Sequence, residues 1–190
     1  MKKFFKSVLV LTIATGLVAF TTPVEEKSVK PEESTVTWKG YKVTGSHEGT
    51  VQLQSGNLEF DGDQLTGGEF VVDMSTLIST DLTGEYKGKL EVHLKSDDFF
   101  GVEKFPTASL KITDVKSNGK NSYEVTGDLT VKGKTNPVTF DMSVYGNKAT
   151  ANVKIDRTKY DIRYGSGSFF DDLGDKTIYD EFDLVVDLQF

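Results

Sequence analysis

The sequence contains no cysteine among its 190 residues, and only two histidines, His47 and His93. The absence of cysteine excludes disulfide bonds, thiolate nucleophiles and zinc sites built on cysteine. Two histidines far apart in the chain do not suffice for a histidine-rich mononuclear metal site. We therefore predict no metal, no cofactor and no catalytic residue.

Positive charge is also in short supply. Lys and Arg number 22 against 29 Asp and Glu, which gives a net charge of −7 and an isoelectric point near 4.9. A nucleic-acid-binding surface needs a basic stripe to displace counterions from the phosphates. The charge balance argues against a nucleic-acid partner.

No apolar run is long enough to cross a membrane, which takes about 20 residues. The longest run, Val8–Phe20, follows three lysines and leads into small residues at Ala19–Thr22. This order is typical of a secretory signal peptide, and we predict one over residues 1–22. A retained anchor is the alternative. Export predicts a periplasmic or secreted bacterial protein with no stable membrane span after cleavage.

The rest of the chain divides into two parts. Residues 23–33 are charged and without a pattern, and we expect a linker. From 34 to 190 apolar and polar residues alternate, as in Phe182–Phe190, which is typical of β-strands. Turn signals such as "SGN" at 55–57, "DGD" at 61–63 and "YGNK" at 145–148 separate the runs.

Short connections favour antiparallel pairing, so we predict one all-β domain over 34–190. About eight strands with one apolar face each would close into a barrel or stack as a sandwich. The only helical candidate, Glu85–Leu94, would be a short insertion.

The inward faces predict an apolar lumen. They carry several small residues (Gly127, Ala108, Ala149 and Ala151), which favours an open lumen over a filled one. A barrel packed solid remains the alternative. The residues that we predict to line the lumen or its rim are Trp38, Phe70, Phe99, Phe100, Ala108, Val125, Leu129, Phe140, Met142, Ala151, Val153, Phe169, Leu184 and Val186.

Two polar residues are candidates for contact with a ligand head group. His47 lies in "TGSHEG", which we interpret as a turn at the barrel mouth. Arg157 follows a predicted strand, and its planar guanidinium suits a phosphate or carboxylate. Each has a structural alternative: a satisfied structural histidine, and an ion pair between Arg157 and a nearby Asp that fixes the glycine-rich loop.

Two acidic pairs adjoin two phenylalanine pairs, in "DDFF" at 97–100 and "FFDD" at 169–172. Paired carboxylates can perform glycoside chemistry or hold calcium, but neither spacing matches a calcium loop. We interpret the aspartates as solvated and the phenylalanines as cover for apolar space. Phe99 and Phe100 are then either a lid on the lumen or part of the core.

The chain from Thr35 to Phe190 resembles the YceI-like, polyisoprenoid-binding family. Three stretches carry the resemblance, together with a matching front half over 44–74: "HLKSDDFFGVEKFPTASLKIT" (93–113), "YEVTGDLTVKGKTNPVTF" (123–140) and "IDRTKYDIRYGSGSFFDDLGDKTIYDEFDLVVDL" (155–188). The resemblance implies an extended lipocalin-like antiparallel barrel in the bacterial envelope. It also implies an elongated isoprenoid or fatty-acyl ligand in the lumen and no catalytic motif.

Three hypotheses follow. The leading one is a carrier for a polyisoprenoid, an isoprenoid quinone or a fatty-acyl lipid. The second is an enzyme acting on a lipid-like substrate, and the third is a structural or interaction protein with a solid core. The sequence leaves a homodimer open.

Overall fold

The computed structural model describes residues 24–190, which form nine strands, one α-helix and three short 3-10 helices. The predicted signal peptide lies outside the described residues. The strands are β1 (Glu25–Ser28), β2 (Thr35–Lys42), β3 (Gly45–Asp61), β4 (Gln64–Ser79), β5 (Thr107–Gly119), β6 (Ser122–Val131), β7 (Lys134–Tyr145), β8 (Lys148–Asp156) and β9 (Ile178–Gln189).

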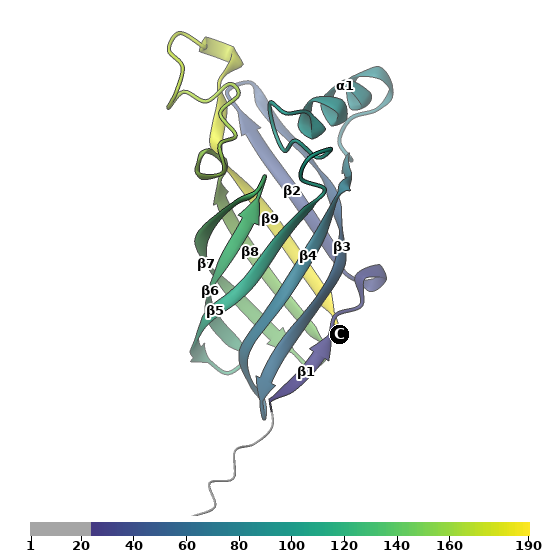
Figure 1. Cartoon of the computed structure of the whole chain (residues 1–190), viewed down its shortest axis with the longest axis vertical. Helices are drawn as coiled ribbons and strands as arrows, with labels where there is room; N and C mark the ends of the chain where they lie inside the picture. Colours follow the sequence, from purple (N-terminus) through teal and green to yellow (C-terminus); the bar gives the residue numbers. More distant parts are fainter. Residues whose placement is uncertain (1–23) are drawn as a thin grey trace, which may run out of the picture.

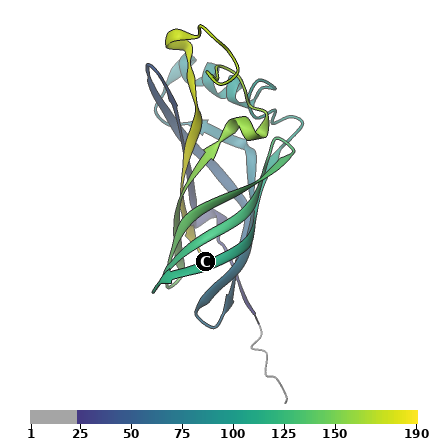
Figure 2. The same cartoon turned by 90° about the vertical axis from the view of Figure 1, so that its left-hand side faces the viewer.

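All strand pairs are antiparallel, and they close into a barrel (Figures 1 and 2). The order runs β3-β2-β9-β8-β7-β6-β5-β4, and β4 pairs again with β3. β1 lies outside this ring and pairs only with the lower part of β3. The predicted all-β barrel with a short helical insertion is confirmed.

Alternating burial shows why these residues form strands. In β6 every second residue is buried, and the residues that alternate with them are exposed or half-buried. The buried ones are Tyr123, Val125, Gly127, Leu129 and Val131. Tight turns join the strands, and Gly62 and Gly133 take the positive φ values (59° and 70°) that such turns need. The interior is therefore apolar on one face of every strand.

The sequence at 55–57 is not a turn. β3 runs unbroken from Gly45 to Asp61, and the pairing register with β4 shifts at Leu53/Ser55. Gly56 is there for close approach, because a Cβ on it would lie 2.5 Å from a ring carbon of Phe70. "SGN" thus marks a bulge inside one long strand rather than the end of it.

Most of the segment predicted to be a linker forms regular structure instead. Residues 25–28 form β1, and residues 31–33 form a 3-10 helix. The side chain of Val29 is 6% exposed and belongs to the core, and its backbone N–H donates to Gly56. Pairing with the free edge of lower β3 orders a segment whose own sequence shows no period.

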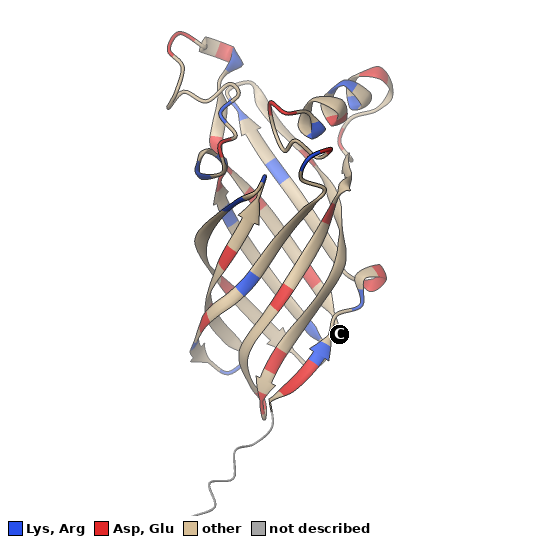
Figure 3. Cartoon of the chain, viewed as in Figure 1, with Lys and Arg blue, Asp and Glu red and all other residues tan. Residues whose placement is uncertain are grey.

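The two ends of the barrel differ. Helix α1 (Gly84–Lys95) and the connection between β8 and β9 project from one end, which we call the upper end (Figure 1). At the lower end Leu58, Val125 and Ala149 are fully buried, and the rings of Phe60 and Phe190 lie 6.0 Å apart. Charges of both signs are interspersed along the strands and loops (Figure 3). The lower end is packed, so any open interior lies above it.

Candidate functional site

A cavity of about 240 Å³ occupies the upper part of the barrel interior. Its walls come from all eight barrel strands, and its roof comes from α1 and the segment after it, through Leu90, Leu94, Phe99 and Phe100. The lining is almost wholly aliphatic and aromatic. Polar side chains enter it only near the mouth.

The strand register explains this lining. Trp38 pairs with Leu184, and Leu184 pairs with Val153, so the three share one inward-facing row. The row below repeats the pattern, with Val36, Val186 and Ala151 side by side. Because side chains two residues apart on a strand face the same way, each strand contributes its apolar set to the cavity.

Most of the predicted lumen residues line this cavity. They are Trp38, Phe70, Phe99, Phe100, Ala108, Leu129, Phe140, Met142, Ala151, Val153, Leu184 and Val186, and His47 and Arg157 lie at its edge. Their contact with a ligand stays a prediction.

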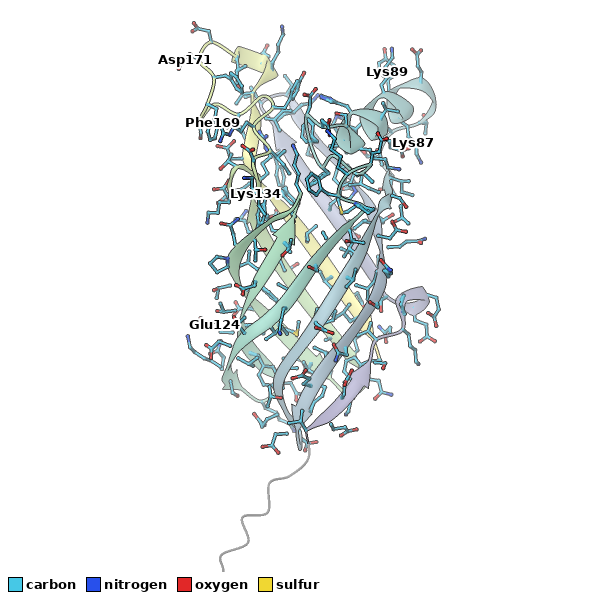
Figure 4. All side chains as sticks on the ribbon, in the orientation of Figure 1. Lys87, Lys89, Glu124, Lys134, Phe169 and Asp171 are labelled. Carbon is cyan, nitrogen blue, oxygen red and sulfur yellow. The ribbon has the colours of Figure 1, made fainter. Side chains whose placement is uncertain are left out.

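Two predicted lumen residues lie elsewhere. Val125 is inward but 0% exposed and lies in the packed lower core, opposite Phe140 and Val115, so it fills the barrel instead of lining its cavity. Phe169 is 45% exposed on the loop that projects from the upper end (Figure 4). Its ring lies under the guanidinium of Arg163, 4.5 Å away, and neither residue lines the cavity.

The small inward residues fall into two groups, those that line the cavity and those in packed regions. Ala108 and Ala151 line the cavity, whereas Ala149 is buried in the packed part. Gly127 allows β5 and β6 to approach, since a Cβ there would lie 2.9 Å from Leu110 and from the carbonyl oxygen of Lys111. Small residues therefore indicate open space only in the upper rows.

His47 lies in β3 and not in a turn, because the β2–β3 hairpin keeps its pairing as far as Lys42 and Gly45. Its Nδ1 lies 2.8 Å from a carboxylate oxygen of Asp81. Asp81 also accepts hydrogen bonds from the Ser79 hydroxyl and the backbone N–H of Glu48. Burial raises the pKa of Asp81, but these three bonds outweigh it and hold that pKa below its usual value.

The surroundings of Arg157 fit a structural role, which was the alternative to contact with a ligand head group. The side chain is 5% exposed, and its three nitrogens donate to the carbonyl oxygens of Tyr179, Ile162 and Ile178 at 2.8–3.0 Å. Asp180 lies 3.6 Å away. Burial lowers the pKa of Arg157, and the charge of Asp180 opposes that shift. The guanidinium thus ties the connection after β8 to the start of β9.

The roof is an aromatic cluster. The ring of Phe99 packs edge-on against His93 of α1 at 4.9 Å and lies 5.6 Å from Tyr164 in the β8–β9 connection. Phe100 packs edge-on against Phe182 of β9 at 6.4 Å. These contacts join α1, the segment after it and the β8–β9 connection over one end of the cavity.

The family model for the YceI-like domain matches residues 28–190. The chain belongs to the YceI-like family. A UPF0312 protein of Pseudomonas putida is 36% identical over 98 residues, which cover 52% of this chain and 49% of the relative. A UPF0312 protein of Pseudomonas aeruginosa is 41% identical over 69 residues, 36% of each chain. The matched segments thus span half or less of these curated relatives.

Solved structures show the same fold. BcnA of Burkholderia cenocepacia superimposes with a TM-score of 0.63 at 21% identity, covering 84% of this chain and 98% of BcnA. A polyisoprenoid binding domain from Saccharophagus degradans gives 0.55 at 12% identity, covering 85% and 97%. In residues 24–190 of this YceI-like chain, no helix has the length and apolar character to cross a bilayer.

Sequence reasoning missed several residues of the site. Leu90 and Leu94 form part of the roof, and their spacing of four on the predicted helix is the signal that could have found them. Gly40 and Lys42 also line the cavity at its mouth. Nothing in their local sequence separates them from ordinary strand residues.

Proposed function

We propose that this YceI-like protein binds one elongated apolar lipid in the barrel cavity and carries it through the bacterial envelope. The ligand class is a polyisoprenoid, an isoprenoid quinone or a fatty-acyl lipid. The observation that carries the proposal is the apolar lining of a cavity that lies above a packed lower end. Each buried CH₂ contributes about 0.8 kcal/mol, so two or three isoprene units reach micromolar affinity after ordering costs.

The polar groups at the mouth support binding over catalysis. His47 and the Ser79 hydroxyl both bond to Asp81, so the serine does not donate to the imidazole as an activated nucleophile would. The guanidinium of Arg157 is committed to backbone carbonyls. These groups anchor the rim of the cavity.

The deciding experiment is mass spectrometry of an organic extract from protein purified from its own host. We expect one dominant lipid in about equimolar amount with the protein. A protein that carries no lipid, and that binds none of the three ligand classes on titration, would be the solid-core barrel instead.

Export is part of this proposal and has its own test. The lysines and apolar run of the first 22 residues support removal near Ala19–Thr22. N-terminal sequencing of the protein from its host should find a mature start in that region. A protein that still begins at Met1 in the cytoplasmic fraction would contradict the envelope location.

A further inference from the structure

The mouth of the cavity contains a row of inward residues that differs from the rows below it. Gly40 of β2 pairs with His47 of β3 on one side and with Phe182 of β9 on the other. All three line the cavity, and Trp38 lies on the same face one row deeper. A glycine thus lies at the centre of this inward row.

The space over Gly40 is empty. A Cβ built on Gly40 would meet no atom within 4 Å. Gly49, which pairs with Trp38 in the row below, is the opposite case, because a Cβ there would lie 1.9 Å from the carbonyl oxygen of Ile78 and 2.6 Å from the Trp38 ring. We call the space bounded by Gly40, His47, Phe182 and the Trp38 ring the Gly40 niche.

One positive charge beside the niche is uncommitted. Lys42 lies two residues above Gly40 on the same strand and lines the cavity. Within residues 24–190 its ammonium group has neither an ion-pair nor a hydrogen-bond partner, although acidic residues outnumber basic ones in the chain. Two other polar residues of the rim, His47 and Arg157, are held by Asp81 and by backbone carbonyls.

These features restrict where the polar end of an amphiphile can lie. The deeper walls are hydrocarbon, and a charge buried there without a partner is strongly unfavourable. The niche is the one part of the lining, among the described residues, that combines free space with an unpaired cation. Asp81 faces the same region, but it already accepts three hydrogen bonds.

The geometry points to a head-group site for an anion in the Gly40 niche: a carboxylate or phosphate at the end of an apolar chain pairs with Lys42, and the chain runs down past Trp38. This inference rests on the proposed function and adds the head-group class to it. Fatty acids and prenyl phosphates share this chemistry, whereas fatty alcohols, prenols and quinones lack it. A charge-assisted contact at the mouth selects the ligand, and the apolar walls hold it.

The test uses Trp38, the chain's only tryptophan, as a fluorescent reporter beside the niche. The purified chain, stripped of lipid, is titrated with hexadecanoic acid and hexadecanol, and with farnesyl phosphate and farnesol. We expect each anion to bind about tenfold more tightly than its alcohol. Whichever anion binds more tightly, the fatty acid or the prenyl phosphate, identifies the source of the head group.

Two variants locate the effect. Lys42→Met keeps the aliphatic stem and should reduce anion binding about tenfold, to the level of the alcohol, with alcohol binding unchanged. Gly40→Leu fills the niche without changing charge and should weaken the anions by a similar factor. The matched control is Lys39→Met, since Lys39 lies on the same strand but pairs with Glu48 at 3.4 Å and does not line the cavity. It should leave all four affinities unchanged.

The outcomes separate the site from the proposed function. Equal binding of anion and alcohol by the natural chain would overturn the head-group site and leave the lipid-binding cavity standing. Equal losses for anion and alcohol in Lys42→Met would also overturn it. No binding of any of the four compounds would overturn both proposals. Thermal melting of each variant identifies losses that come from unfolding.

Discussion

Among single residues, Ala151 decides most directly whether the interior stays open. Its methyl group lies between Met142 of β7 and Val186 of β9, and it lines the cavity. Replacement by Trp should fill the cavity, abolish binding of a long-chain lipid and cost about 1–3 kcal/mol of stability through overpacking. Lipid titration together with urea unfolding measures both effects.

The control for this substitution is Asn152→Trp, which adds the same ring at the next residue on the exposed face of β8. Binding should be unchanged there. Full lipid binding by a folded Ala151→Trp variant would contradict the position of the ligand in these rows.

Arg157 is the residue whose structural role can be tested most sharply. Substitution by Met leaves the carbonyl groups of Tyr179, Ile162 and Ile178 without their donors. We expect a loss of about 2–5 kcal/mol in the free energy of unfolding, because these buried acceptors and Asp180 lose their partner. Anionic and neutral lipids should lose affinity equally. A selective loss for anionic lipids at unchanged stability would assign Arg157 to the head group instead.

The residue scale also shows why sequence reasoning left the roles of these side chains open. The sequence around His47 fits both a head-group contact and a structural residue, and the deciding partner, Asp81, lies 34 residues away. The three acceptors of Arg157 lie up to 22 residues away. A strand's own sequence determines which side chains face inward, but only the closure of the barrel determines what they meet.

At the scale of elements, the strands with regular alternation were predictable and the irregular ones were not. β6 and β9 follow the period of two. In β3 the "SGN" sequence predicts a turn because glycine and asparagine are turn residues, whereas Gly56 serves the close approach of Phe70. β1 has no pattern because it is an outer strand ordered by pairing with β3. Local propensity was overridden in both cases by contacts with distant residues.

The segment after α1 gives a prediction about ligand release. Phe99 is 6% exposed within the aromatic cluster, whereas Phe100 is only partly buried and packs against Phe182 at the cavity. Phe100→Ala should speed lipid release, measured by stopped-flow transfer to vesicles, with a small loss of stability. Phe99→Ala should also cost about 3–5 kcal/mol, because it removes a core side chain.

The controls are Asp97→Asn and Asp98→Asn. Both carboxylates are 66% exposed, and Asp97 forms an exposed ion pair with Lys104. Exposed pairs contribute about 0–1 kcal/mol, so release and stability should hardly change. Unchanged lipid release from the Phe100→Ala variant would show that Phe100 is not part of a lid. A large effect of either Asp substitution would support a functional role for the acidic pair.

For the whole molecule, the pairing of β2 with β9 brings the first and last strands of the barrel together. Near the mouth this pairing is irregular, with a register shift between Gly40 and Lys42. On the outside of the shift the Tyr41 hydroxyl donates to Asp183 at 2.7 Å, and Lys154 donates to the same carboxylate at 3.0 Å. We call this β2–β9 pairing the seam of the barrel. Side-chain hydrogen bonds thus reinforce the seam where the register shift interrupts the backbone hydrogen bonds.

Two carboxyl groups with lowered pKa values, one of them beside the β2–β9 pairing, predict that stability depends on pH. The hydrogen bond from Tyr41 holds the pKa of Asp183 below its usual value, and Ser75 does the same for Asp73. A carboxyl whose pKa is lower in the folded state stabilises the fold above its unfolded pKa, about 3.9, and loses that contribution as pH falls through the folded value. Stability should therefore be level between about pH 5 and 8 and fall below about pH 4.

Tyr41→Phe tests whether the seam carries part of this effect. It should lower the free energy of unfolding near about pH 7, and the difference from the natural chain should shrink near about pH 3, where Asp183 becomes protonated. Tyr145→Phe is the matched control, because Tyr145 is 59% exposed at the far end of β7. Urea unfolding at both pH values measures the effect. A difference that stays constant across this range would show that Tyr41 acts through packing, and the closure of the barrel would then not depend on the charge of Asp183.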